Sequence, residues 1–193
     1  MLPLRALALL LCVSTLALAA SGCGGGGGKS YSGTKPSTWA ATVCGAVSDW
    51  TVRLQAEGAR LSSGLNKTTD IELVKTSLVA YLDSAARSAR TMMTRIDAAG
   101  APAVKEGAAI QKDLVSGLEG AQASLTRAVA RAKRLSTTDP QTFTIGVQAL
   151  AADIQEELTA VSGKVSTVGD KYDDASLDKA TSEEPSCSGI GGA

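Results

Sequence analysis

Apolar residues recur every three or four positions along four long stretches of the chain, and this spacing is the period of an α-helix. No stretch keeps the alternation of apolar and polar residues that is typical of a strand. The pattern therefore predicts an all-α protein. The four apolar stripes run from Trp39 to Leu65, from Ile71 to Ile96, from Ile110 to Leu135 and from Phe143 to Val168.

The breaks between these stripes carry residues that favour the first turn of a helix. They are Ser37 as an N-cap, Thr69 with Glu72 as a capping box, Pro102 in the first turn of the third helix, and Asp139 with Pro140 as the N-cap and first turn of the fourth. Four helices joined by such short breaks favour an antiparallel up-down-up-down four-helix bundle over residues 37–170. A polar tail, residues 171–193, follows the bundle.

The first 22 residues have the features of a secretory signal peptide: Arg5, then an apolar run from Ala6 to Ala20, then small residues. The sequence Ala-Ser-Gly-Cys of residues 20–23 resembles the bacterial lipobox, with alanine where leucine is commoner. The resemblance implies cleavage between Gly22 and Cys23 and attachment of a lipid to the Cys23 thiol. The chain would then be anchored on the extracytoplasmic face of the cell membrane.

The glycine run that follows is compatible with a tether over residues 23–36, with a root-mean-square reach of roughly 20 Å. A phosphate-binding loop is the alternative, because Gly28, Lys29 and Ser30 match the end of its motif. The first glycine of that motif falls on Cys23, and no strand precedes the run. We therefore expect a tether.

Charge and composition narrow the classes of function. Without residues 1–22 the chain has 18 basic and 19 acidic residues, which argues against a nucleic-acid-binding protein. The sequence has no histidine, so it lacks the ligands that haem and di-iron sites in helical bundles use. We expect no cofactor and no bound metal.

Four cysteines are present, and two of them remain after the expected processing. Cys12 leaves with the signal peptide and Cys23 receives the lipid. Cys44 and Cys187 then form either one disulfide or two free thiols, and an oxidising compartment favours the disulfide. An up-down-up-down bundle supports this pairing, because the first helix begins where the fourth ends.

Residues 98–135, the sequence VCGAVSDW of residues 43–50 and the sequence LDKATSEEPSC of residues 177–187 resemble a group of small alanine-rich lipoproteins and secreted proteins of actinobacteria. The likeness covers most of the chain after the signal peptide. It implies an extracytoplasmic helical bundle with a disulfide between Cys44 and Cys187. It implies no activity.

Several side chains have the residue types that metal binding or catalysis would need. Met92 and Met93 could ligate a soft metal, but their helical spacing is typical of core packing. Asp153, Glu156 and Glu157 fall within one turn and could work as paired carboxylates, although Asp153 and Glu156 are off the apolar stripe and favour a solvated face. We predict no catalytic residue and therefore no enzyme.

Two further features could mark an interaction surface. Arg127, Arg131, Lys133 and Arg134 form a basic cluster, which is either a favourable charge at a helix C-terminus or a patch that contacts a partner. Trp39 and Trp50 lie three helical turns apart, and we expect both in the core.

The sequence thus favours a lipid-anchored, non-enzymatic interaction or scaffolding module of the cell envelope, with a protein partner. The alternative is a carrier that holds a lipid or another small apolar ligand between its helices. The many alanines in the stripes count against the carrier, because they let helices approach closely and leave little space.

Overall fold

A computed structural model of the protein describes residues 30–188, apart from the side chains of Leu158 and of residues 161–170. The expected signal peptide, Cys23 and most of the tether lie outside the described residues. The all-α fold class is confirmed, because the described residues form helices joined by loops. The helices are α1 (Pro36–Leu65), α2 (Ile71–Ala98), α3 (Gly107–Lys133), α4 (Pro140–Lys171), α5 (Ala175–Glu183) and a 3-10 helix, η1 (Pro185–Cys187).

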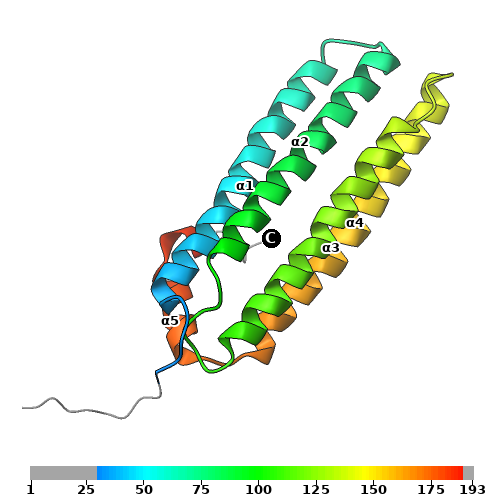
Figure 1. The fold of residues 1–193 in the computed structure, drawn as a ribbon. Coiled ribbons are helices and arrows are strands. Elements are labelled where there is room, and N and C mark those ends of the chain that lie inside the picture. The colour runs from blue at the N-terminus through cyan, green and yellow to red at the C-terminus, as the bar shows by residue number, and fades with distance from the viewer. Residues whose placement is uncertain (1–29, 189–193) are drawn as a thin grey trace, which may run out of the picture.

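The part of the chain that the structure describes has five α-helices, one more than the sequence predicted. The long helices pack in chain order, α1 on α2, α2 on α3 and α3 on α4. The α1–α2 and α3–α4 loops lie at one end of the molecule, which we call the distal pole (Figure 1). The chain enters α1 at the opposite end, the proximal pole, where the α2–α3 connection also lies (Figure 1).

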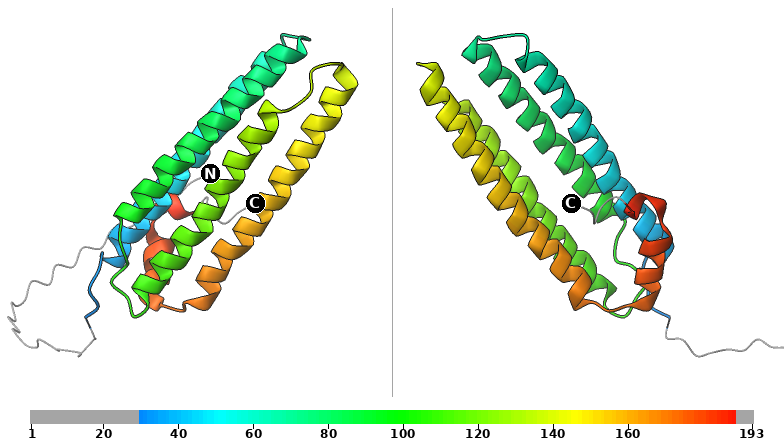
Figure 2. Two further views of the ribbon diagram at one scale, coloured as in Figure 1. Left: turned by 45° about the vertical axis from the view of Figure 1, so that its right-hand side comes forward. Right: turned by 180° about the vertical axis from the view of Figure 1, so that it is seen from behind.

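The additional helix belongs to the tail that was expected only to be polar. The carboxylate of Asp174 caps α5 by accepting hydrogen bonds from the backbone N–H groups of Ser176 and Leu177, at 3.0 and 3.2 Å. Both α5 and η1 pack against α1, and Figure 2 shows them beside its proximal half. The tail therefore folds back over the start of the first helix.

A disulfide fixes this tail to α1. Cys44 and Cys187 are bonded, with their Cα atoms 4.9 Å apart and a sequence separation of 143. The predicted pairing is confirmed. Cys44 is buried between α1 and the tail, so the bond lies within packed structure.

The entry to α1 is held by the α2–α3 loop. Thr34 pairs with Pro102 in an isolated parallel bridge, in which the Thr34 N–H donates to the Ala101 carbonyl at 2.8 Å and the Ala103 N–H donates to the Thr34 carbonyl at 2.7 Å. The prediction that Pro102 opens the third helix is wrong, since α3 begins at Gly107. A Cβ atom on Gly107 would lie 1.9 Å from the Pro102 carbonyl oxygen, so this loop needs glycine there.

Two of the predicted caps also differ. α1 has Lys35 at its N-cap and Pro36 in its first turn, instead of Ser37 at the cap. α2 is capped by Asp70, whose carboxylate accepts from the N–H groups of Glu72 and Leu73 at 2.9 and 3.3 Å, so the Thr69–Glu72 capping box is wrong. The cap of α4 is confirmed, because Asp139 accepts from the Thr142 N–H at 2.9 Å.

The buried apolar side chains form two clusters along the long axis. Alanine is frequent in the distal cluster, which lets α2 and α3 approach closely. The proximal cluster contains Trp39, Val43, Ala46, Met92, Ile96, Val104, Ile110, Leu114 and Tyr172. The distal cluster contains Leu82, Ala85, Ala86, Ala89, Leu125, Ala128, Val129, Ala132 and Leu150.

Candidate interaction groove

The basic cluster predicted from the sequence lies in the last turns of α3, facing α4. Arg127 contacts Glu157 at 2.9 Å, and Arg131 contacts both Asp153 and Glu157 at 2.5 Å. The hydroxyl of Ser124 and the guanidinium groups of Arg127 and Arg131 lower the pKa of Glu157 to about 2. Two of the four cations therefore join α3 to α4.

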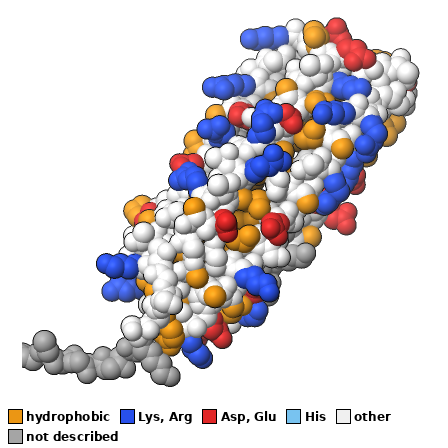
Figure 3. Space-filling model, viewed as in Figure 1, with side chains coloured by type: hydrophobic (Ala, Val, Ile, Leu, Met, Phe, Trp, Pro, Cys, Tyr) orange, Lys and Arg blue, Asp and Glu red, His pale blue; other side chains and the backbone are white. Residues whose placement is uncertain are grey.

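The other two cations of that cluster are Lys133 and Arg134, and both are exposed at the end of α3. On the right-hand side of Figure 3, over α3 and α4, basic side chains have acidic ones beside them. The cluster as a whole is thus a mixed-charge surface. The sequence also offered Asp153, Glu156 and Glu157 as paired carboxylates. Asp153 and Glu157 form ion pairs with arginine, and Glu156 is exposed.

A second ionic cluster joins the end of α4 to α3. The Asp113 carboxylate accepts hydrogen bonds from Lys171 Nζ at 2.7 Å and from the Tyr172 hydroxyl at 2.8 Å. These bonds lower the pKa of Asp113 and raise that of Lys171. The cluster is satisfied internally and fixes the turn into the tail.

The methionines and the first tryptophan are structural. Met92 is buried in the proximal cluster, and Met93 packs against it. Trp39 is also buried, and its indole N–H donates to the Gly100 carbonyl and to Gln111 Oε1, both at 3.0 Å. Within residues 30–188, no three side chains of His, Cys, Asp or Glu come together in a way that could hold a metal ion.

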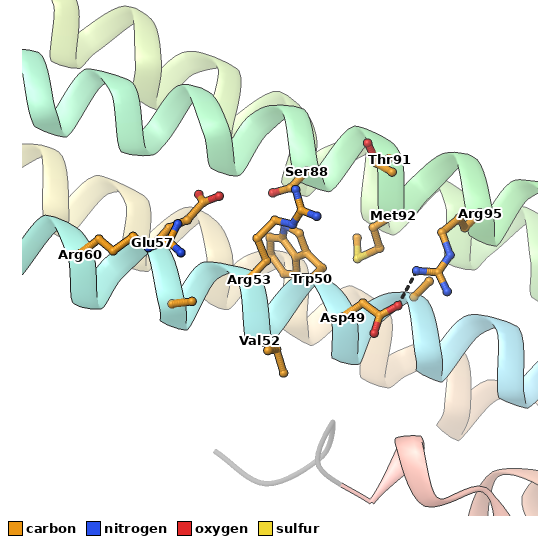
Figure 4. Close-up of a pocket in the computed structure, with 12 residues that line it drawn as sticks. Asp49, Trp50, Val52, Arg53, Glu57, Arg60, Ser88, Thr91, Met92 and Arg95 are labelled. Atoms are coloured by element: carbon orange, nitrogen blue, oxygen red, sulfur yellow. Dashed lines mark hydrogen bonds and ion pairs between the residues drawn. The ribbon is translucent and has the colours of Figure 1, made fainter.

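Trp50 differs from Trp39, because it is only half-buried and lines a surface groove between α1 and α2. The groove has a volume of about 540 Å³. Figure 4 shows α1 along its lower side and α2 along its upper side. The lining residues are Ala46, Asp49, Trp50, Val52, Arg53, Ala56, Glu57 and Arg60 from α1, and Ser88, Thr91, Met92 and Arg95 from α2.

Only some of the charged side chains in the groove form ion pairs. Asp49 and Arg95 form an ion pair across the seam at 2.6 Å, drawn as a dashed line in Figure 4. Arg53 and Arg60 are exposed and form no ion pair with any described residue. Glu57 also forms no ion pair with a described residue, so the unpaired charges of the groove are two positive and one negative, all on α1.

Two buried polar atoms near these arginines also have no hydrogen-bond partner among the residues described. They are the indole nitrogen of Trp50, which is a donor, and Oε2 of Glu57, which is an acceptor. The other oxygen of Glu57 accepts from the Ser84 hydroxyl of α2 at 2.9 Å. A buried polar atom without a partner costs about 1–3 kcal/mol. Both atoms are enclosed by neighbouring protein atoms and do not face the open groove.

A second hollow of about 400 Å³ continues the groove toward the distal pole. Glu57 and Arg60 line both hollows, so the two form one channel along the α1–α2 seam. Small residues make up much of its distal half. This half is lined by Glu57, Arg60, Leu61, Gly64, Ser77, Ala80, Tyr81 and Ser84.

Sequence reasoning did not find this groove. Arg53 and Arg60 are seven residues apart, which places them on one side of α1, but that spacing alone does not distinguish a binding surface from a solvated face. The half-burial of Trp50 depends on how α2 lies against α1. Comparisons of the chain with protein-family models, with curated proteins and with solved structures find no match.

Among the described helices, none combines the length and the hydropathy that a membrane-spanning segment needs.

Proposed function

We propose that this protein is a lipid-anchored helical module on the extracytoplasmic face of the cell membrane, where it binds a protein partner without catalysing a reaction. Cleavage after Gly22 and lipidation of Cys23 would attach it, and the glycine-rich segment would leave it free to rotate above the surface. We also propose that the protein is related to the small alanine-rich lipoproteins of actinobacteria.

The observation that carries the interaction role is the α1–α2 groove. It combines two exposed arginines that lack an ion pair among the described residues with a half-buried tryptophan. Interaction surfaces are enriched in arginine and tryptophan, and such residues dominate binding energy. The exposed Lys133 and Arg134 at the distal pole are the second surface that could contact a partner.

The disulfide supports the proposed compartment. Structural disulfides persist in oxidising environments outside the cytosol. The bond between Cys44 and Cys187 joins the tail to the helix that follows the tether. It would therefore keep the membrane-proximal pole folded.

The antiparallel arrangement of the four long helices is also proposed here. It is supported by the loops, which lie at the distal pole for α1–α2 and α3–α4 (Figure 1). Contacts follow chain order, and the tail instead of α4 packs on the proximal half of α1. We infer a bundle whose first helix is covered partly by the tail.

The test has two stages. Peptide-level mass analysis of the protein from host membranes, without reductant, should give a diacylglyceryl Cys23 N-terminus. Mild cross-linking in intact cells should then give a discrete complex for the native chain and much less of it for Cys23→Ala. A native N-terminus at Met1 would overturn the anchor, and no complex under several growth conditions would overturn the interaction role.

The carrier hypothesis makes a different prediction. A lipid or apolar ligand between the helices would displace close contacts between the alanines that pack α2 on α3. Native mass spectrometry of protein taken from its own membrane would show a retained ligand. Protein of the bare polypeptide mass favours the interaction module.

A further inference from the structure

The α1–α2 groove is long and open enough to hold a third helix. Its lining extends from Ala46 to Gly64 on α1, which corresponds to about 27 Å at 1.5 Å per residue. A helix of about 18 residues has this length. Small side chains, including Ala56, Ala80 and Ser84, line the seam and would let a helix backbone approach.

Charges along the groove have a defined order. Arg53, Glu57 and Arg60 follow one another at spacings of four and three residues, so they lie on one side of α1 within two turns. Neither arginine has an ion pair with a described residue, while one Glu57 oxygen lacks a hydrogen-bond partner. The groove thus presents two positive positions, with the Glu57 carboxylate between them, over about 10 Å.

A partner helix repeats its own side chains at the same spacing. Acidic residues at positions i and i+7 of that helix would face Arg53 and Arg60. A basic or uncharged polar residue at i+3 or i+4 would face the half-buried Glu57, so that no second carboxylate lies against it. Small apolar residues on the same face would contact Ala56, Met92 and the other groove residues.

We propose that the groove binds an acidic amphipathic helix of another envelope protein, recognised by this order of charges. The inference rests on the proposed function, because it names the partner class for the same groove. A small anion would fill only part of a groove of about 540 Å³ with a further 400 Å³ beyond it. Charge complementarity along two turns favours a helix.

The first experiment uses two synthetic 18-residue helical peptides and the protein purified with its native N-terminus in detergent. One peptide has glutamate at i and i+7 with serine at i+4, and the other has lysine in place of both glutamates. The glutamate peptide should bind with a Kd on the order of tens of micromolar and shift the emission of Trp50. The lysine peptide should bind at least tenfold more weakly.

Matched charge reversals locate the contact. Arg53→Glu with Arg60→Glu changes the net charge by the same amount as Lys133→Glu with Arg134→Glu at the end of α3. The first pair should weaken the glutamate peptide at least tenfold, and the second pair less than threefold. Arg53→Gln with Arg60→Gln is the milder variant, and circular dichroism confirms that each variant folds.

Equal weakening by both charge reversals would overturn the inference, because it would show that overall charge drives binding. Equal binding of the two peptides, or binding of neither, would also overturn it. Loss of the emission change in Trp50→Phe, with binding kept, would confirm that the peptide lies over Trp50.

A second experiment separates this inference from the proposed function. A photo-reactive amino acid is placed at Ala56 in the groove or at the exposed Ala123 on α3, in cells. If Ala56 forms adducts, and the cross-linked partner peptide has acidic residues seven positions apart, the groove proposal is supported. Adducts only from Ala123, or a dimer of this chain from Ala56, overturn the groove proposal and leave an interaction role. Adducts from neither position overturn both.

Discussion

Removal of the Cys44–Cys187 disulfide should lower the free energy of unfolding by about 3–5 kcal/mol. The bond closes a loop of 143 residues, and the chain-entropy relation gives about 5 kcal/mol at 25 °C for a loop of that length. Part of this gain is offset if the reduced protein releases its tail, because a free tail regains conformational entropy. The net effect on the melting temperature should be a decrease of about 10–15 °C.

The structure also predicts which part of the protein responds first. The tail packs on α1 through few apolar side chains, with Ala180 buried and Leu177 only half-buried. We therefore expect α5 and η1 to detach on reduction while the two apolar clusters persist. Amide hydrogens of α5 should lose their protection from exchange, while those of α2 and α3 keep most of theirs.

The assay is urea unfolding followed by circular dichroism at pH 7. The chain used begins at Gly24, so it lacks Cys12 and Cys23 and contains all the described residues. Reductant added to this chain is compared with Cys44→Ala combined with Cys187→Ser, which controls for effects of the reductant. Reductant should have no effect on the double variant.

Two results would refute this reasoning. A loss of less than 1 kcal/mol would mean that the bond does not constrain the unfolded chain as loop closure requires. Unchanged exchange protection in α5 after reduction would mean that packing, and not the bond, holds the tail on α1.

Three further substitutions test local interactions, each by thermal or urea unfolding. Glu157→Gln should cost about 1 kcal/mol at pH 7. Hydrogen bonds from Ser124, Arg127 and Arg131 lower the pKa of this carboxyl to about 2, so the difference should fade as the pH drops from about 4.5 to about 2. A pH-independent cost would contradict the ion-pair role. Gly107→Ala should cost about 2–3 kcal/mol, since its Cβ would lie 1.9 Å from a loop carbonyl oxygen, whereas Gly45→Ala meets nothing within 4 Å and should be neutral or stabilising. Asp70→Ala should cost about 1 kcal/mol, and Thr69→Ala should cost less than half of that if Asp70 is the cap.

The long helices and the disulfide could be predicted, because the helices follow from local apolar spacing and the disulfide from the number of cysteines. The period of the apolar stripes located the long helices, and the parity of the cysteines favoured the pair that the structure contains. The fifth helix was missed because nine residues are too few for a clear stripe. Asp174, followed by Ala-Ser-Leu, was the available signal for its N-cap.

Details at the helix ends were harder, because several residues there can serve as a cap. Thr69 and Asp70 are adjacent acceptors, and only the backbone geometry selects Asp70. Pro102 has the residue type for a first turn, but its pairing with Thr34 comes from a strand-like segment 68 residues earlier in the chain. Sequence periodicity contains no information about that contact.

The candidate surface depended on the register between helices, which the sequence did not reveal. Arg127 and Arg131 were recognised as part of a basic cluster. Their ion pairs with Asp153 and Glu157 could not be predicted, because they depend on how α4 lies against α3. Arg53 and Arg60 look no different in the sequence. Only the packing of α2 beside them shows which arginines border a groove.

The position of the groove relative to the tether determines which partners could reach it. The groove begins at Ala46, about 15 Å along α1 from Pro36, and continues for about 27 Å toward the distal pole. Thr34 is held by the α2–α3 loop, so the proposed tether from Cys23 would end there and would have a reach of about 15–20 Å. If Cys23 carries the lipid, the groove therefore lies within about 60 Å of the membrane surface. A partner in the same membrane would meet it at a raised effective concentration, and binding in the micromolar range would then be sufficient for occupancy. Weak recognition through two arginines is consistent with a tethered module of this kind. The proposed anchor would keep the partner close, so a larger interface with higher affinity would not be needed.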